Sequence, residues 1–425
     1  MHAPLLLSRR FLPLFLAQAL GALNDNLFKN ALVVLLVFRG IPGAPALVAL
    51  SGGLFILPYL LFSATAGQLA DRFDKARLIR LTKAAEIVLM LAAALALLEG
   101  SVPLLLAVLF GLGIQAALFG PLKYGILPDL FADPATLLRA NALVEAGTFA
   151  AILLGTIAGG TLIGLPEGGL IVAAFGLVLA VAGYAAARTI PSTGPAAPGL
   201  RIGRNIARET ARLLRAARAR SPVWTSLLGL SWFWALGAIF LAQFPVLAQT
   251  TFHADNRLVT LLLASFTIGI GLGSLAAGAP AARRLANRAL PLLSLCTAGF
   301  AALAAAPRAA LWTTPAAMLA DPAGAAALLC LVGAAASGGL FSVPLYATLQ
   351  RAADPAERAR TIAANNVMNA LFMVAAALAI AALAAAGLPP LGILALAAAL
   401  NLLAAVALRR HAGIAASPVP RQSRL

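Results

Sequence analysis

The stretch Gln18-Ala-Leu-Gly-Ala-Leu-Asn-Asp-Asn-Leu-Phe-Lys-Asn30 lies inside an apolar run that extends from Phe11 to Phe38. The run is long enough to cross a bilayer as a helix, which takes about 20 residues. It nevertheless contains six strongly polar side chains: Gln18, Asn24, Asp25, Asn26, Lys29 and Asn30. A charged side chain at the bilayer centre costs at least about 2.5–3.5 kcal/mol. This helix is therefore expected to line a polar path in a protein that moves something across a membrane.

The rest of the chain has the composition of a membrane protein. Of its 425 residues, 62% are hydrophobic and 11% are charged, whereas a soluble domain carries about a quarter charged residues. The apolar runs are continuous and about 20 residues long, which suits helices and not the alternating strands of a barrel. The sequence thus predicts an all-α polytopic membrane protein.

The formal net charge is +17, which in a soluble protein would suggest nucleic acid. Here the basic residues lie between apolar runs, so membrane topology and anionic headgroups of the membrane lipids explain them. We expect no nucleic-acid partner. Cys296 and Cys330 are the two cysteines, both within apolar runs and without a metal-ligand spacing. We expect no metal, no cofactor and no enzyme activity.

Twelve spans are predicted, in two groups of six. They cover roughly residues 11–38, 46–69, 78–98, 102–122, 140–164, 168–187, 223–249, 258–279, 289–306, 324–349, 361–386 and 389–408. The expected organisation is an N-terminal six-helix bundle (1–187), a cytoplasmic basic linker (188–222) and a C-terminal six-helix bundle with a short cytoplasmic tail (223–425). Within the linker, arginines recur at helical spacing up to Arg220 and predict a basic amphipathic helix on the membrane surface, in contact with anionic lipid.

The distribution of Lys and Arg predicts the orientation. Placing both termini on one side gathers nearly all loop lysines and arginines there and leaves Arg39, Arg257 and Arg308 opposite. The basic side of such proteins faces the cytoplasm. We therefore expect both termini to be cytoplasmic.

The two halves also resemble each other in sequence. The segment that begins at Gly67 has a counterpart that begins at Gly278, 211 positions later. Asp-Pro-Ala at 133–135 recurs at 354–356, 221 positions later, each followed by an arginine. These offsets predict a parallel duplication of six spans, with the halves related by an axis along the membrane normal.

The loop after the second span resembles the signature of the major facilitator superfamily, G-x-x-x-D-R-x-x-x-R in loose form. The match falls on Gly67, Asp71, Arg72 and Arg77. The resemblance implies a fold of two six-helix bundles and a gating role for these four residues. We expect Asp71 and Arg77 to latch helix ends, with membrane topology as the alternative explanation of the arginines. The second copy of the loop lacks the aspartate.

Three segments resemble the bacterial lysophospholipid transporter family within that superfamily: FLAQALGALNDNLFK (15–29), GPLKYGILPDLFADPATLLRANALVE (120–145) and AANNVMNALFMV (363–374). The resemblance implies a multi-pass protein of the bacterial inner membrane. It would flip lysophospholipids, notably lysophosphatidylethanolamine, to the inner leaflet for reacylation. Because none of the three histidines starts an H-x-x-x-x-D acyltransferase signature, a separate acyltransferase is the expected partner.

The candidate site starts on the first span. Gln18, Asp25 and Lys29 are spaced by seven and four, so they share one helix face, which Asn26 and Asn30 flank. Asp25 is expected to bind an ammonium and Lys29 a phosphate. The alternative is a buried structural pair of Asp25 and Lys29. Asn24 points away and is expected to bond to a neighbouring helix.

Other intramembrane polar residues complete the candidate set, with snorkelling or helix–helix hydrogen bonds as the alternative explanation. They are Gln115, Lys123, Asn141, Glu145, Asn365 and Asn369. Glu145 is a second candidate for the ammonium, and Lys123 for the phosphate. Lys83 and Glu86 are expected to pair structurally.

Two other functions remain open on the sequence. A multidrug or small-metabolite efflux carrier of the same fold would use Asp25 or Glu145 as a titrating group, but Thr156 stands where the antiporter signature has proline. A lipid-binding partner of an acyltransferase that does not itself transport would leave the buried charges unexplained.

Overall fold

The computed structural model describes residues 5–38, 41, 43–279, 283–307 and 312–415. Arg39 and Arg308, which the orientation argument uses, lie outside these ranges. Eleven helices in the described residues are long and apolar enough to span a membrane, and a shorter apolar helix, Ala289–Ala305, brings the number to twelve. The prediction of an all-α protein with twelve spans is confirmed.

The twelve membrane helices fall into two sets of six. The first set is α1 (Leu12–Phe38), α2 (Ala44–Arg72), α3 (Lys75–Glu99), α4 (Val102–Leu130), α5 (Pro134–Leu162) and α6 (Gly168–Arg188). The second set is α8 (Ser221–Val246), α9 (Asn256–Ala277), α11 (Ala289–Ala305), α13 (Pro322–Ala352), α14 (Arg358–Ala385) and α15 (Pro390–Ala415). Between the sets lies α7 (Ile206–Arg218), and short turns of helix occur at η1 (Leu5–Leu7), η2 (Leu247–Thr251), α10 (Arg283–Ala286), α12 (Pro315–Ala320) and η4 (Pro355–Glu357).

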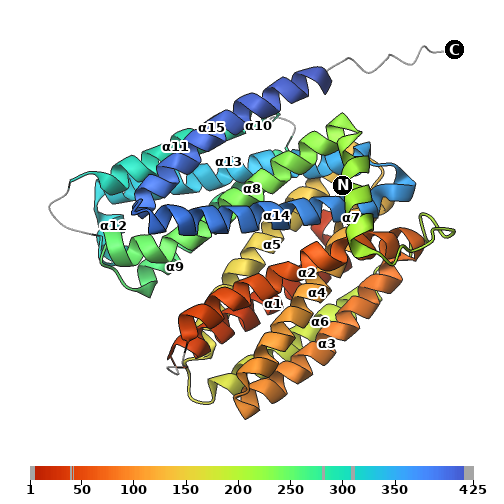
Figure 1. The fold of residues 1–425 in the computed structure, drawn as a ribbon, viewed down its shortest axis with the longest axis horizontal. Coiled ribbons are helices and arrows are strands. Elements are labelled where there is room, and N and C mark those ends of the chain that lie inside the picture. The colour runs from red at the N-terminus through yellow and green to blue at the C-terminus, as the bar shows by residue number, and fades with distance from the viewer. Residues whose placement is uncertain (1–4, 39–40, 42, 280–282, 308–311, 416–425) are drawn as a thin grey trace.

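Each set packs as its own bundle, seen as two groups of helices in Figure 1. In the first bundle α1 packs on α5 and α6, and α4 packs on α2 and α3. In the second bundle α13 packs on α9 and α11, and α8 packs on α14 and α15. Besides smaller contacts of α4 with α14 and of α5 with α13, the bundles meet mainly along two helix pairs, α2 with α14 and α5 with α9.

Glycines of the duplicated loop segment permit both of these contacts. A Cβ at Gly67 of α2 would meet Ala363 and the backbone of Arg360 on α14. Its repeat partner Gly278, which follows α9, lies close to Arg139 and Ala142 of α5. Equivalent residues of the two halves therefore form equivalent contacts, as the sequence duplication predicts for halves related by a twofold axis.

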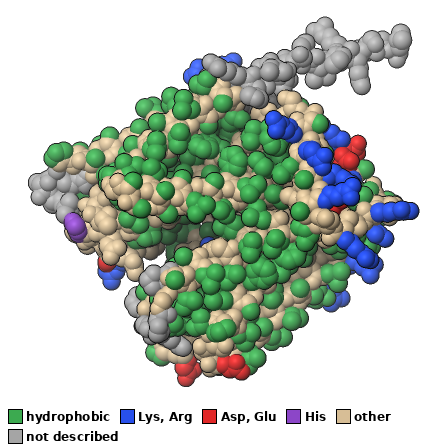
Figure 2. Space-filling model, in the orientation of Figure 1, with side chains coloured by type: hydrophobic (Ala, Val, Ile, Leu, Met, Phe, Trp, Pro, Cys, Tyr) green, Lys and Arg blue, Asp and Glu red, His purple; other side chains and the backbone are tan. Residues whose placement is uncertain are grey.

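One end of the molecule carries most of the described lysines and arginines (Figure 2). We call it the basic end; α1, α5 and α14 begin there, and α2, α4 and α13 end there. Asp74 and Asp133 start α3 and α5 at this end by accepting backbone N–H groups of Arg77 and Thr136, both at 2.8 Å, as N-cap residues do. Away from the basic end, Figure 2 shows a hollow between the two bundles.

The linker helix α7 differs from the prediction in what it contacts. Its arginine-rich face is exposed, but its buried residues Leu213 and Ala217 belong to a core cluster shared with both bundles. The helix lies against α2, α14 and α8, across the basic end (Figure 1). Its apolar stripe therefore packs on protein, and not on lipid as we expected.

Close packing of α9 on α13 generates the first prediction. A Cβ at Gly273 would overlap the backbone of Ala336, whereas a Cβ at Gly271, two residues away on α9, would meet nothing within 4 Å. Gly273→Ala should lower the free energy of unfolding by about 1–3 kcal/mol because overpacking strains the core. Gly271→Ala, the matched control, should keep or slightly raise stability because alanine favours helix. Thermal unfolding in detergent measures both, and equal midpoints would contradict the helix packing.

Candidate functional site

The polar residues of α1 divide between two sides of the helix. Asn24 points to α3, where its Nδ2 donates to Glu86 Oε1 at 3.0 Å. Glu86 also accepts from Lys83 Nζ at 2.6 Å and from Gln115 Nε2 at 3.0 Å, and it is fully buried. This cluster ties α1, α3 and α4 together inside the first bundle. It takes Gln115 away from the cavity that we expected it to line.

Asp25 and Lys29 lie on the other side of α1 and are not an ion pair. Among the described residues, no carboxylate oxygen lies within 4.0 Å of the Lys29 or Lys123 ammonium. Lys29 Nζ instead lies 5.7 Å from the centre of the Phe55 ring. Asp25 is 9% exposed and its Oδ1 has no hydrogen-bond partner in the protein. The geometry therefore does not support the alternative of a structural Asp25–Lys29 pair.

Gln18, Asn26 and Asn30 lie along the α1–α5 contact. Gln18 Oε1 accepts from Thr148 Oγ1 at 2.8 Å, while its buried Nε2 has no protein partner. Asn30 Nδ2 donates to Thr156 Oγ1 at 3.2 Å and to the Asn26 carbonyl at 2.9 Å. Asn26 Nδ2 donates to the Ala22 carbonyl at 2.8 Å. Gln18 thus keeps a free donor, whereas the amides of Asn26 and Asn30 are used within the helix pair.

Glu145 on α5 is 1% exposed and divides its two oxygens between different tasks. Oε2 accepts from the Tyr124 hydroxyl at 3.0 Å, and Oε1 has no protein partner. Lys123 Nζ lies 4.8 Å from the centre of the Tyr124 ring, within electrostatic range of both Glu145 and Asp25. The four charged candidates therefore surround one region between α1, α4 and α5.

Two tyrosines connect this region to the second bundle. The rings of Tyr124 on α4 and Tyr346 on α13 are stacked, with centres 4.4 Å apart and planes 9° apart. Tyr346 accepts from Trp234 Nε1 at 3.0 Å. We call Tyr124 and Tyr346 the tyrosine pair. Neither residue was predicted from the sequence, because a tyrosine within an apolar run does not by itself indicate a functional site.

The asparagines of α14 have separate surroundings. Asn365 is 1% exposed and faces the Tyr346 hydroxyl. Asn369 accepts from Ser231 Oγ at 2.9 Å, which is the helix–helix bond offered as its alternative role. Asn366, which the candidate set omits, has a buried Nδ2 without a protein partner, beside Gly120 of α4.

Asn141 belongs to the contact between the bundles, nearer the basic end. Its Nδ2 donates to Gln350 Oε1 at 2.7 Å, and Gln350 Nε2 donates to Asn141 Oδ1 and to the Tyr124 carbonyl, both at 3.0 Å. All these groups are saturated by one another. Asn141 is therefore not one of the unpartnered polar groups, although it lies one helical turn from Glu145 on α5.

The remaining unpartnered atoms identify the region where a ligand fits. Buried polar groups are nearly always hydrogen-bonded, so an unpartnered one needs an explanation. Six such atoms belong to α1, α5 and α14. Asn24 Oδ1 lies beside Gly176 of α6, inside the first bundle, and Asn365 Oδ1 belongs to the side chain that faces the Tyr346 hydroxyl. The other four are Gln18 Nε2, Asp25 Oδ1, Glu145 Oε1 and Asn366 Nδ2. Together with Lys29 and Lys123 they offer both acceptors and donors. We call these six residues the inter-bundle site.

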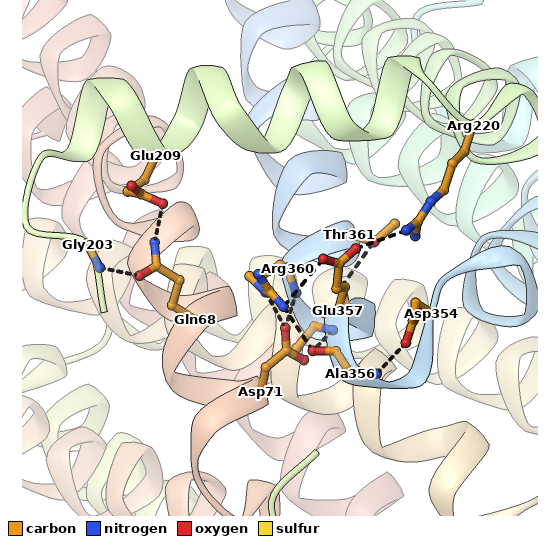
Figure 3. A network of polar contacts seen from close by, with 11 residues as sticks. Gln68, Asp71, Gly203, Glu209, Arg220, Asp354, Ala356, Glu357, Arg360 and Thr361 are labelled. Carbon is orange, nitrogen blue, oxygen red and sulfur yellow. Dashed lines mark hydrogen bonds and ion pairs between the residues drawn. The ribbon is translucent and has the colours of Figure 1, made fainter. Parts of the chain in front are cut away.

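The signature loop lies below this site at the basic end, where Asp71 is fully buried (Figure 3). Its carboxylate accepts the backbone N–H groups of Ala359 at 2.9 Å and Arg360 at 3.2 Å, and Arg360 Nε at 2.9 Å. These donors belong to the first turn of α14, where the positive end of the helix dipole also favours an anion. Asp71 therefore joins the two bundles, and its partner is Arg360.

The other signature residues have smaller roles in this geometry. Gly67 permits the close approach of α2 to α14 described above. The guanidinium of Arg72 lies 5.3 Å from the centre of the Phe73 ring. Arg77 is exposed, and no carboxylate of the described chain pairs with its guanidinium. Of the two residues expected to latch helix ends, Asp71 bonds to Arg360 of α14, whereas Arg77 forms no ion pair in the described chain.

A second ionic connection between the bundles was not predicted from the sequence. Asp129 at the end of α4 pairs with Lys75 at 2.9 Å and with Arg358 of α14 at 2.7 Å. Beside it, Arg220 pairs with Glu357 at 3.1 Å, and Arg360 lies 3.8 Å from the same carboxylate (Figure 3). The two pairs between distant segments, Asp129 with Arg358 and Arg220 with Glu357, are 229 and 137 positions apart, so sequence spacing gave no signal for them.

The linker is hydrogen-bonded to the first bundle before it reaches α7. Gln68 donates to Glu209 of α7 at 3.2 Å and accepts the Gly203 N–H at 2.7 Å. Asp74 accepts from Ser192 Oγ at 2.8 Å and from the N–H groups of Thr193 and Gly194. Partial burial would raise the pKa of Asp74, but these bonds and the Arg77 N–H lower it below the usual aspartate value.

The part of the chain that the structure covers contains no group of three His, Cys, Asp or Glu residues placed to hold a metal ion. The inter-bundle site contains two carboxylates and two ammonium groups, so it presents both signs of charge.

Comparison with known proteins agrees with this architecture. The Major Facilitator Superfamily sequence model matches residues 11–377. The lysophospholipid transporter LplT of Escherichia fergusonii is 33% identical over 350 residues, which cover 79% of this chain and 78% of that protein. Among solved structures, the human organic anion transporter MFSD10 (TETRAN) superposes with a TM-score of 0.74 at 19% identity over 96% of this chain and 100% of that one. A bacterial homologue of the iron transporter ferroportin in an outward-facing state gives 0.68 at 16% identity, over 96% and 100%. The chain is a multi-pass membrane protein that belongs to the major facilitator superfamily and, within it, to the lysophospholipid transporter family.

Proposed function

We propose that this protein transports lysophospholipids such as lysophosphatidylethanolamine across the bacterial inner membrane, from the outer to the inner leaflet, for reacylation by a separate acyltransferase. The observation that carries the proposal is the inter-bundle site. It holds two carboxylates and two ammonium groups that do not pair with each other. A family relative named as a lysophospholipid transporter supports the same substrate class.

The charges of the site match a zwitterionic headgroup. Asp25 Oδ1 and Glu145 Oε1 are unpartnered acceptors for an ammonium, and Lys29 and Lys123 are donors for a phosphate. Charge-assisted hydrogen bonds are the strong ones, particularly in a medium of low dielectric constant. Gln18 and Asn366 add free donors at the edges. A headgroup that carries both signs would satisfy all of these groups at once.

The basic end is assigned to the cytoplasm because Lys and Arg accumulate on that side of membrane proteins. Both termini then lie in the cytoplasm. The bundles are joined at this end through Asp71, Asp129 and the tyrosine pair, and the hollow of Figure 2 faces away from it. These contacts support the proposal of an outward-facing state, in which the signature residues hold the cytoplasmic side closed.

The acyl chain of the substrate sets a further requirement on the cavity. A single chain prefers hydrocarbon by about 0.8 kcal/mol per buried CH₂, so a wholly polar cavity would be unfavourable. Beside the site, Phe149 of α5 stacks on Trp234 of α8, with ring centres 5.8 Å apart, and meets Phe233 edge-on. We propose that the chain lies along such aromatic walls and reaches the bilayer sideways between the bundles.

The direct test is uptake of labelled lysophosphatidylethanolamine by spheroplasts, with and without an uncoupler. Uptake should depend on this protein and persist when the proton gradient is collapsed, because the site needs no titrating step. Monoacyl lipid should compete strongly and diacyl lipid weakly, since the second chain has no matching wall. Equal competition, or absence of uptake, would favour the efflux carrier instead.

A second prediction concerns the two charges on α1. Asp25→Asn and Lys29→Met should each reduce uptake by about two orders of magnitude, because each removes a charge-assisted bond worth about 1.5–3 kcal/mol. The double variant should be no better than either single one, since the two side chains are not paired. Membrane insertion is checked by immunoblot. Recovery of uptake in the double variant would show that they form a structural pair.

The third prediction separates the two candidate latch residues of the signature loop. Asp71→Asn removes a buried charge that three donors of α14 stabilise, so the cytoplasmic interface should open more often. Arg77→Ala, the matched control, should leave it unchanged. The readout is maleimide labelling from the cytoplasmic side of Ile362→Cys, a fully buried interface position, with Cys296 and Cys330 replaced by alanine. Equal labelling in both variants would remove Asp71 from the latch.

A further inference from the structure

Glu145 is the residue of the inter-bundle site that contacts the tyrosine pair. Glu145 belongs to α5, Tyr124 to α4 and Tyr346 to α13, so the three residues extend from the first bundle into the second. One carboxylate oxygen of Glu145 is free and the other holds the Tyr124 hydroxyl at 3.0 Å. A single side chain thus contacts both the ligand region and an inter-bundle contact.

Tyr124 contributes two separate contacts to the closed interface. Its ring stacks on Tyr346 at 4.4 Å, and its carbonyl accepts from Gln350 at 3.0 Å, both partners being residues of α13. Gln350 is in turn paired with Asn141 through two hydrogen bonds. The orientation of the Tyr124 side chain is therefore important for how α4 meets α13.

We propose that Tyr124 is a coupling residue: a cationic headgroup that binds Glu145 weakens the hold of Glu145 on Tyr124 and so favours opening of the cytoplasmic side. The inference rests on the proposed function, because it needs a headgroup that donates to Glu145. It explains how binding of the headgroup would change the equilibrium between the closed and the open cytoplasmic side.

The physical basis is the charge of the carboxylate. A hydrogen bond to an ionised acceptor is roughly twice as strong as one between neutral groups, and the buried position leaves little solvent to screen it. In the empty site that charge acts on the Tyr124 hydroxyl. An ammonium at Oε1 neutralises much of the charge, and the bond to Tyr124 then approaches the neutral case.

A ligand shifts a conformational equilibrium only if it interacts differently with the two states. Here the difference is the strength of the Glu145–Tyr124 bond, which matters only while Tyr124 is held against Tyr346. Lysophosphatidylethanolamine should therefore raise the fraction of cytoplasm-open molecules by about fivefold or more, within the usual range of coupling between sites.

The experiment measures spin-label distances across the basic end in nanodiscs of diacyl phospholipid. The labels replace Ala132, in the α4–α5 connection, and Arg351, near the end of α13, both exposed, in a chain with Cys296→Ala and Cys330→Ala. Binding of labelled lysophosphatidylethanolamine is measured on the same samples. In the protein with an unmodified site, the fraction of molecules with a long distance between the two labels should increase when this lipid is added.

Two variants that differ in which hydroxyl is lost decide the proposal. Tyr124→Phe keeps the ring stack and loses the bond to Glu145; its long-distance population should already be raised without lipid and should change less than about twofold on addition. Tyr346→Phe is the matched control. It loses the bond from Trp234 Nε1 and the contacts of its hydroxyl with Tyr124 and Asn365. It keeps the ring stack and the Glu145–Tyr124 bond, so it should still respond to the lipid. Glu145→Gln should bind the lipid more weakly and lose the response.

The outcomes separate the two proposals. If lysophosphatidylethanolamine binds and both phenylalanine variants respond like the unmodified site, the coupling role of Tyr124 is wrong and the transport proposal stands. If the two variants lose the response equally, the hydroxyl of Tyr124 has no special role and the coupling is also wrong. If no binding occurs to the unmodified site, the proposed function itself fails, and the coupling with it.

Discussion

An ionised group in a medium of low dielectric constant must be satisfied by something, and in this chain the partner of a buried charge is often supplied by the other bundle. Asp71 shows this most fully, because every donor to its carboxylate belongs to α14. Removing one partner of a buried pair costs about 3–5 kcal/mol. Parting the bundles at the basic end therefore requires water or new donors at Asp71. The Asp71 carboxylate is thus the most deeply buried of the charges that hold α2 against α14, beside the ion pair of Asp129 with Arg358.

The duplication of the chain makes the two contacts between bundles similar in shape but not in charge. Gly67 and Gly278 occupy equivalent positions at the two contacts, and the packing is closer at Gly67. The first contact adds an ionic bond to Arg360, whereas the second repeat of the loop has no aspartate to offer Arg139. In the proposed transport cycle, the contact with the ionic bond would be the one that opens and closes, and the contact without it would be the pivot.

Much of the fold was predictable because hydrophobic runs, basic loops and repeat offsets are local or periodic signals. The spans agree with the helices, and Asn24 bonds to a neighbouring helix as its direction on α1 indicated. The choice of partners was not predictable. Asp71 bonds to Arg360 and not to Arg77, and Gln115 bonds to Glu86, because these pairings depend on which helices the tertiary structure brings together. Stacking of Tyr124 on Tyr346 could not be inferred for the same reason.

The docked linker helix has a mechanical consequence. The helix α7 is bonded to α2 through Gln68 and Glu209, and it also contacts α14. In the proposed transport cycle, separation of α2 from α14 at the basic end would therefore break one of these two contacts of α7. Leu213 and Ala217 would then meet water, at about 25 cal/mol for each Å² of apolar surface uncovered. Burial of these two side chains would therefore favour return to the closed arrangement, although neither belongs to the inter-bundle site.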